Sequence, residues 1–344
     1  MLNWESKPAE RPLSGVTEVS GDKSISHRAL FFGAIAEGCT IIRGFLPGED
    51  CLATMRIFRS LGVQINQIEE TTLSIEGVGL RGLKPPTQAL DCGNSGTTMR
   101  LLMGLLAAQP FDSVLIGDES LQKRPMQRVS LPLNQMGAHM TTQDGHAPID
   151  IQKNAHLMGI TYTLPVASAQ LKSALFLAGL YCISPLFIQE PVITRDHTER
   201  LFTLFGYPLL TTEQRQHTLL PGARFKGTRV DVPGDLSSAA FFIVAATLIE
   251  SSDLLIQCVG VNPTRMGIIH ILKAMGADIE ITKMRLFSGE VVADIRVKYA
   301  TLCGVTIPES WVSLAIDEFP IIFIAAAMAR GTTKILGVRE LRYK

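Results

Sequence analysis

Two kinds of apolar helical pattern alternate along the chain. In the first kind, apolar residues three and four apart make one buried face, and a glycine then ends the helix. A short strand-like stretch follows each helix. The spacing of about 70 residues is longer than that of solenoid repeats and predicts a domain-forming unit. The pattern occurs at 55–65, 131–140, 201–210 and 268–279, with Gly62, Gly137, Gly206 and Gly276 as the closing glycines.

The second kind of helix opens on a capping residue and continues with small and apolar residues. Ser and Asp accept hydrogen bonds from the free backbone N–H groups of a helix start. The alanine and glycine content predicts that these helices are buried on several sides. The five predicted openings are Ser24, Ser95, Ser168, Ser237 and Asp317.

Together the two patterns predict an α/β fold of repeated units, each with strands and two helices. Three complete units fill about 21–233, and a fourth runs from about 234 to 316. A fifth begins at Asp317 and reaches Lys344 before its second helix. We therefore expect a C-terminal portion to be missing and the 344 residues to melt with poor cooperativity.

Composition narrows the class of protein. Hydrophobic residues make up 46% and charged residues 19%, which is enough for a large core. Lys plus Arg equals Asp plus Glu at 32 each, so neither nucleic acid nor an anionic membrane is expected as a partner. The longest apolar run, 239–249, is too short for a transmembrane span, and the N-terminus does not resemble a signal peptide. We expect a cytoplasmic monomer.

Cysteine spacing and one glycine motif exclude further classes. The six cysteines show neither metal-site nor redox-pair spacing, so we expect buried thiols and no metal. The segment 77–82, GVGLRG, matches a dinucleotide-binding motif literally. Pro85 and Pro86 follow it and cannot open the helix that such a motif requires. We expect no cofactor.

Several predicted helix starts carry cations. In GDKSISHR, 21–28, Lys23 and Arg28 lie where the helix dipole disfavours positive charge, unless an anion sits between them. In GNSGTTMR, 93–100, Asn94 offers donors and Gly96 would let a ligand approach the backbone. Alone, the first segment could be an ordinary capped helix and the second a glycine-rich turn.

Three further segments add charged or polar groups. QKRPMQR, 122–128, holds Arg124 beside a proline, and by itself it could be a charged surface loop. SAQLKSA, 168–174, places Ser168 and Gln170 at a helix mouth. In RDHTER, 195–200, an extended stretch would align Arg195, His197 and Glu199 on one face, with His197 orienting Arg195.

The segment DEFP, 317–320, differs because it brings two acids to an apolar helix. One acid would suffice for capping, so a carboxylate facing a basic pocket could act as a general base. A concave site lined by several helix ends would bind a small, multiply charged anion, or two of them.

These motifs, in this order, resemble the 5-enolpyruvylshikimate-3-phosphate synthase family over Gly21–Lys344, and GDKS, SAQLK, RDHTE and NPTR at 262–265 resemble its class II branch. The resemblance implies a two-domain enolpyruvyl-transferase fold of βαβαββ units. The first domain would be 21–233. The second would be 1–20 plus 234–344, incomplete at its C-terminus.

The family transfers enolpyruvate from phosphoenolpyruvate to the 5-hydroxyl of shikimate 3-phosphate and releases phosphate, on the route to chorismate and the aromatic amino acids. By resemblance, Asp317 and Lys23 are catalytic, with Asp317 taking the proton of the attacking hydroxyl. The ligands implied for shikimate 3-phosphate are Lys23, Ser24, Arg28, Ser168, Gln170, Arg195, Asp317 and Lys344. Those implied for phosphoenolpyruvate are Lys23, Asn94, Gly96, Arg124 and Gln170.

Two departures from the family pattern carry expectations. The acid, arginines and lysine that follow GVRELR in the family are absent, so we expect the 344 residues alone to be inactive. Gly96 stands where class II members often have alanine, so we expect the full-length protein to bind the inhibitor glyphosate. The competing hypotheses are the related UDP-N-acetylglucosamine enolpyruvyl transferase, which typically needs a reactive cysteine in a basic loop, and a non-catalytic anion-binding fragment.

Overall fold

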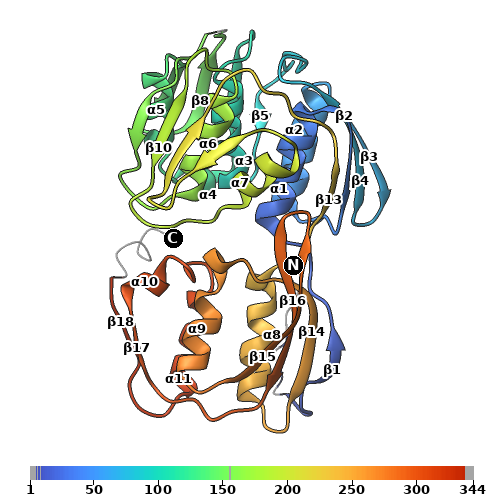
Figure 1. The fold of residues 1–344 in the computed structure, drawn as a ribbon, viewed down its shortest axis with the longest axis vertical. Coiled ribbons are helices and arrows are strands. Elements are labelled where there is room, and N and C mark those ends of the chain that lie inside the picture. The colour runs from blue at the N-terminus through green and yellow to red at the C-terminus, as the bar shows by residue number, and fades with distance from the viewer. Residues whose placement is uncertain (1–4, 6, 8, 155, 338–344) are drawn as a thin grey trace. The chain divides into compact units, whose positions relative to one another are not determined.

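The structure is a computed structural model that describes residues 5, 7, 9–154 and 156–337. It divides into two compact units (Figure 1). Unit 1 comprises Met1–Ser20, Pro233–Leu286 and Glu290–Lys344. Unit 2 comprises Gly21–Val232 and Phe287–Gly289. Lys344 lies outside the described residues.

Unit 2 contains three four-stranded sheets built on one plan: a parallel pair of strands, to which two further strands are added antiparallel. The strands, in spatial order, are β13 (Arg229–Asp231), β2 (Glu37–Arg43), β4 (Thr72–Val78) and β3 (Gln64–Glu69); β5 (Leu90–Asp91), β6 (Ser113–Ile116), β8 (His146–Gln152) and β7 (His139–Gln143); and β9 (Thr161–Thr163), β10 (Leu186–Gln189), β12 (Gln216–Leu219) and β11 (Leu209–Thr211).

Helices α1, α3 and α6 run through the middle of unit 2, with the sheets around them (Figure 1). Each is buried along nearly its whole length, as the alanine and glycine content predicted. The helices of this unit are α1 (Lys23–Ile35), α2 (Glu49–Ser60), α3 (Gly96–Leu106), α4 (Glu119–Gln122), α5 (Gln127–Gln135), α6 (Ala169–Gly179) and α7 (His197–Leu204).

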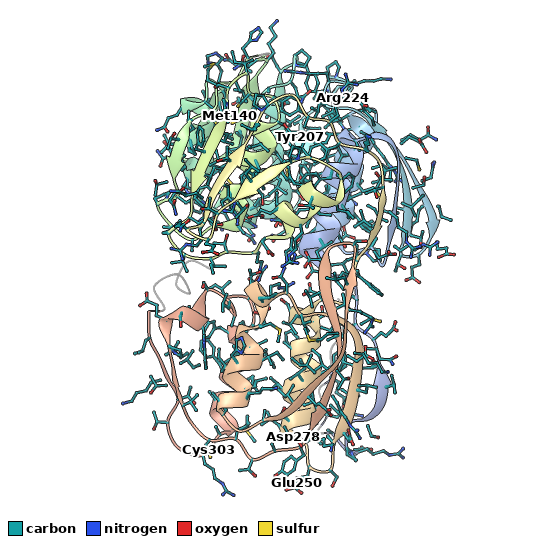
Figure 2. All side chains as sticks on the ribbon, in the orientation of Figure 1. Met140, Tyr207, Arg224, Glu250, Asp278 and Cys303 are labelled. Atoms are coloured by element: carbon teal, nitrogen blue, oxygen red, sulfur yellow. The ribbon has the colours of Figure 1, made fainter. Side chains whose placement is uncertain are left out.

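An aromatic group fills one side of this core. Tyr207 is 1% exposed and packs edge-on against Phe202 at a ring-centroid distance of 5.4 Å. Its hydroxyl donates to the carbonyl oxygen of Leu220, which satisfies the polar end of a buried ring. Tyr207 lies within the packed side chains of unit 2, whereas Arg224 is exposed on its surface (Figure 2).

Unit 1 repeats the sheet plan once, in the order β1-β14-β16-β15, with β1 parallel to β14 and β14 antiparallel to β16. Its strands are β1 (Ser14–Thr17), β14 (Asp253–Gly260), β15 (Asp278–Phe287), β16 (Glu290–Lys298), β17 (Thr306–Ile307) and β18 (Lys334–Ile335). Its helices are α8 (Leu236–Leu248), η1 (Pro263–Arg265), α9 (Gly267–Ala274), α10 (Glu309–Val312) and α11 (Phe319–Met328). No helix in the described ranges has both the length and the hydropathy to cross a bilayer.

The glycine-closed helices are confirmed. Helices α2, α5, α7 and α9 each end just before the predicted glycine, and all four glycines have positive φ angles, between 79° and 100°. Only glycine adopts such angles freely, which explains why the residue recurs at this point.

Two of the five predicted helix openings are right and three are wrong. Ser95 and Ser168 cap α3 and α6 through their side chains. In α1 and α8 the caps are Asp22 and Asp235, two residues before Ser24 and Ser237, because each carboxylate accepts the hydrogen bond from the first turn. At α11 the N-cap is Glu318 rather than Asp317, and its side chain makes no capping bond.

Candidate functional site

The first turns of α3 and α6 meet side by side in unit 2. The amide nitrogen of Gln170 donates to the hydroxyl of Thr97 at 2.9 Å. Further along the two helices, a Cβ built on Gly104 would lie 2.0 Å from the carbonyl oxygen of Ala174, so only glycine permits this close packing. Two positive helix ends, capped by Ser95 and Ser168, are thereby brought together.

Three arginines, named here the arginine cluster, surround these helix ends. Arg100, which is 6% exposed, donates to the side-chain oxygen of Gln170 at 2.5 Å and to the carbonyl oxygen of Pro125 at 3.2 Å. Burial, together with the guanidinium groups of Arg128 and Arg124, lowers the pKa of Arg100 to about 10. Among the described residues, no carboxylate forms an ion pair with any of the three arginines.

Gly96 lies against two guanidinium groups of the arginine cluster. A Cβ at this position would lie 3.2 Å from Nη1 of Arg100 and 3.2 Å from Nη1 of Arg124. Arg124 donates to the side-chain oxygen of Asn94 at 3.0 Å, and Asn94 donates to Asp118 at 2.7 Å. The structure therefore joins Asn94, Gly96, Arg124 and Gln170, four residues that the motifs singled out separately.

The start of α1 forms a second group. Lys23 is exposed, and its ammonium group lies 3.2 Å from the carboxylate of Asp50. Arg28 is 3% exposed and donates to the hydroxyls of Thr198 and Ser173 at 2.7 and 2.9 Å, and to the carbonyl oxygen of Ser24 at 3.0 Å. Ser24 thus lies beside Arg28 although it does not cap the helix.

His27, in the same motif, is buried and neutral. Its Nδ1 lies 2.8 Å from the hydroxyl of Thr54, which lies 2.7 Å from that of Thr98 in α3. Burial lowers the pKa of His27 to about 3, and the nearby Asp50 offsets only part of this effect. The histidine holds α1 against α2 and α3 and does not act as a cation.

Arg195 lies in the loop between β10 and α7, where it is half-buried. The expectation of an extended RDHTER stretch is wrong, because α7 begins at His197 and the alternation of side chains ends there. Glu199, in the first turn of α7, faces Lys172 of α6, whose ammonium group lies 2.5 Å away. Asp317 is an exposed residue of unit 1, and Lys344 lies outside the described residues.

Comparison with known proteins assigns the chain. The family model for EPSP synthase (3-phosphoshikimate 1-carboxyvinyltransferase) matches residues 8–344. A relative named 3-phosphoshikimate 1-carboxyvinyltransferase from Legionella pneumophila (strain Corby) is 55% identical over 344 residues, which are 100% of this chain and 79% of the relative. The chain belongs to the EPSP synthase family.

Other relatives agree with this membership. A 3-phosphoshikimate 1-carboxyvinyltransferase from Methylococcus capsulatus is 54% identical over 96% of this chain and 76% of its own length. The structure of an EPSP synthase from Acinetobacter baumannii superposes with a TM-score of 0.88 at 50% identity, covering 97% of this chain and 76% of that one. The enolpyruvyl transferase NikO from Streptomyces tendae, with a TM-score of 0.74 at 16% identity, shares the fold over 95% of this chain and 75% of its own. The predicted α/β enolpyruvyl-transferase fold is confirmed.

In this EPSP synthase family member, Arg100 is a further candidate site residue that the sequence motifs did not single out. The signal was present: Arg100 stands four residues after Gly96 in α3, so both lie on the same helix face. Long helical side chains also point toward the N-terminus, which brings the guanidinium group of Arg100 to the helix start. Lys172 was missed too, because its partners are 18 and 27 residues away and no local pattern reveals them.

Proposed function

We propose that this chain transfers the enolpyruvyl group of phosphoenolpyruvate to the 5-hydroxyl of shikimate 3-phosphate and releases phosphate. Membership of the EPSP synthase family supports the reaction. The observation that carries the proposal within this chain is the arginine cluster: three guanidinium groups and two helix N-termini, with no acid paired to the guanidinium groups in the part of the chain that the structure describes. Such a place stabilises a small polyanion, because the anion supplies the missing negative charge.

In this proposal phosphoenolpyruvate binds to Asn94, Gly96, Arg124 and Gln170. Arg100 also belongs to the site, because it donates a hydrogen bond that holds Gln170 in place. The backbone at Gly96 lets the anion approach closely because no methyl group stands between the arginines. Lys23 also contacts phosphoenolpyruvate and is catalytic. The positive charges of the cluster would neutralise the phosphate as it leaves.

The proposed ligands of shikimate 3-phosphate are Lys23, Ser24, Arg28, Ser168, Gln170 and Arg195. Contacts in unit 2 support a common location for part of this set, because Arg28 and Ser173 of α6 are hydrogen-bonded and Ser168 opens the same helix. Asp317 as the base and Lys344 as a ligand rest on the motif resemblance alone. The predicted domains, 21–233 and 1–20 with 234–344, are proposed in keeping with the division into units.

The chemistry is an addition followed by an elimination. The 5-hydroxyl oxygen bonds to the central carbon of phosphoenolpyruvate, while the hydroxyl proton passes to Asp317 and the methylene carbon gains a proton. The tetrahedral intermediate then loses phosphate and one methyl proton, which restores the double bond. Water must be kept away, because it would compete with the 5-hydroxyl of shikimate 3-phosphate.

Calorimetry tests the proposal. Shikimate 3-phosphate should bind to the 344-residue chain, and phosphoenolpyruvate should bind in its presence. Arg124→Met should weaken phosphoenolpyruvate binding by about 30-fold, because a charge-assisted contact is lost. The matched control is Arg224→Met, since Arg224 is an exposed arginine paired with Glu37.

Two results would contradict the proposal: binding of UDP-N-acetylglucosamine in place of shikimate 3-phosphate, or equal phosphoenolpyruvate binding by the two arginine variants. Phosphate release, followed in the same samples, tests the proposed transfer itself. Cytoplasmic location and a monomeric state stay predictions.

A further inference from the structure

A buried ion-pair group, named here the lysine cluster, forms around Lys172 of α6. Lys172 is 1% exposed, and its ammonium group lies 2.7 Å from Glu190 and 2.5 Å from Glu199. Burial alone would lower the pKa of Lys172, but the two carboxylates raise it, so the lysine stays charged. The cluster is made by α6, by the residue after β10, and by the first turn of α7.

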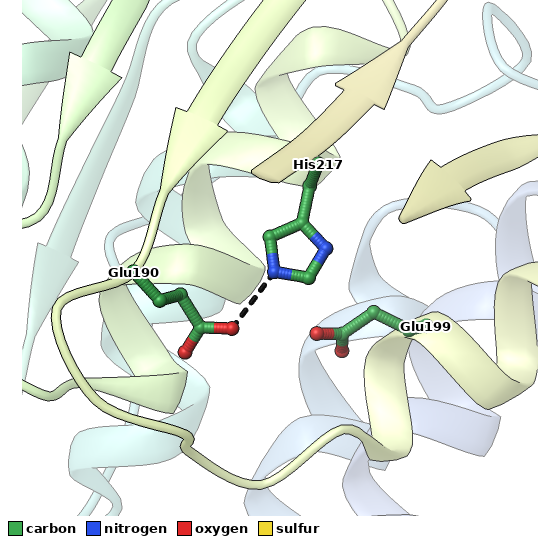
Figure 3. Close-up of side chains that lie close together, drawn as sticks. All are labelled: Glu190, Glu199 and His217. Carbon is green, nitrogen blue, oxygen red and sulfur yellow. Dashed lines mark hydrogen bonds and ion pairs between the residues drawn. The ribbon is translucent and has the colours of Figure 1, made fainter. Parts of the chain in front are cut away.

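His217 completes the cluster from β12, and its ring faces Glu190 and Glu199 (Figure 3). Its Nε2 lies 2.8 Å from Glu190, and its Nδ1 lies 3.0 Å from the hydroxyl of Thr211. A carboxylate only accepts, so Nε2 carries a proton and donates it to Glu190. Glu190, Glu199 and His217 have the spacing of a metal site, but the Lys172 ammonium supplies the positive charge between the acids.

The lysine cluster contacts both ends of the loop between β10 and α7. Residues 190–196 connect β10 to α7, and Arg195 lies near the end of this loop. Glu190 starts the loop and Glu199 follows it, so Lys172 ties both flanks to α6. Within the loop, Thr194 donates to the second oxygen of Glu190 at 2.5 Å. The residue next to Arg195 is therefore bonded to a carboxylate that Lys172 and His217 hold from the other side.

The same helix carries the other proposed ligands. Lys172 stands two residues after Gln170, and Ser173 contacts Thr198 of α7 at 2.6 Å. Helix α6 thus carries Gln170 and also contacts both flanks of the loop that holds Arg195. A fold alone does not require a buried ion pair here, because apolar side chains of similar volume are often equally stabilising.

We infer that Lys172, Glu190, Glu199 and Thr194 are positioning residues for Arg195, holding it in place for the phosphate or carboxylate of shikimate 3-phosphate. The inference rests on the proposed function, which makes Arg195 a ligand. The substrate gains affinity because the loop is ordered before binding and its ordering cost is not taken from the binding free energy.

Thr194→Val tests the inference without removing any of the buried charged groups. The variant keeps the size of the side chain and removes only its hydrogen bond to Glu190. Shikimate 3-phosphate binding, measured by calorimetry on the 344-residue chain, should weaken about tenfold. Thr194→Ser, which keeps the hydroxyl, should bind like the parent. Thr203→Val is the matched control, because Thr203 is an exposed threonine of α7.

Thermal unfolding of the same variants separates positioning from a purely structural role. A lower melting temperature with unchanged affinity for Thr194→Val would overturn the inference, and so would equal weakening by Thr203→Val. Binding by the parent with unchanged affinity in Thr194→Val overturns the inference alone. No shikimate 3-phosphate binding by the parent overturns the proposed function and this inference together.

Discussion

Two buried cations that lie close to α6, Arg100 of α3 and Lys172 of α6 itself, have opposite surroundings. At the start of α6, Gln170 meets Arg100, a buried guanidinium that has no carboxylate paired to it among the described residues. Two residues later, Lys172 is enclosed by Glu190 and Glu199. Both cations are almost fully buried, so their exposure does not distinguish them.

The difference shows in the direction of the two pKa shifts. Burial and the neighbouring arginines lower the pKa of Arg100. The acids around Lys172 outweigh its burial and raise its pKa. A cation that its own protein leaves uncompensated is prepared for an anion from outside, whereas a compensated one serves the structure. A buried charge therefore becomes informative about function only when its partners are counted.

The largest effect is expected at the lysine cluster. Lys172→Met leaves two buried carboxylates without their cation and should lower the free energy of unfolding by about 3–5 kcal/mol. Urea unfolding followed by circular dichroism measures this loss. Lys123→Met, which removes an exposed ion pair to Glu119, should cost less than about 0.5 kcal/mol. A similar small loss for both variants would refute the distinction.

Arg100→Met should show the reverse pattern. Removing this guanidinium relieves repulsion from Arg124 and Arg128, so the free energy of unfolding should change by less than about 1 kcal/mol. Phosphoenolpyruvate binding in the presence of shikimate 3-phosphate should weaken by roughly 30- to 100-fold. If this variant unfolds as easily as Lys172→Met and still binds phosphoenolpyruvate normally, Arg100 has a structural role and not the proposed binding role.

His27 sharpens the comparison as a buried base that stays uncharged. Its pKa is about 3 in the folded chain and about 6.5 when unfolded, so below pH 6.5 the unfolded chain binds the extra proton. Stability should therefore fall as the pH falls from 6.5 toward 3, by up to about 1.4 kcal/mol per pH unit. His27→Gln should flatten this dependence in urea titrations at pH 7 and pH 5, and an unchanged slope would contradict the assignment.

The smallest effect on ligand binding is expected from a methyl group added at Gly96. Gly96→Ala places a Cβ 3.2 Å from the guanidinium nitrogens of Arg100 and Arg124, which must move by a few tenths of an ångström. Glyphosate and phosphoenolpyruvate should each bind about tenfold more weakly in calorimetry, with little change in unfolding. Gly48→Ala is the control, because its Cβ meets only ordinary contacts at 3.5 Å. Unchanged glyphosate affinity in Gly96→Ala would count against this geometry.

What the sequence predicted depended on how local the cause was. Glycines such as Gly62 and Gly276 end helices through their own backbone angles, so a short pattern revealed them. The openings at Ser24 and Ser237 were wrong by two residues, because a nearby aspartate made the capping bond. The joining of Gly96, Arg124 and Gln170 followed from the family resemblance, since residues so distant along the chain share no local pattern.

Gly104 carries a consequence that reaches beyond packing. In place of a side chain, Gly104 has only a hydrogen atom between α3 and the backbone of α6. Any larger residue would push the two helices apart. The hydrogen bond between Arg100 and Gln170 would then be lost, although the new side chain would contact neither residue. A substitution at Gly104 would therefore weaken binding as the loss of a ligand contact does, although Gly104 is not one of the proposed ligands.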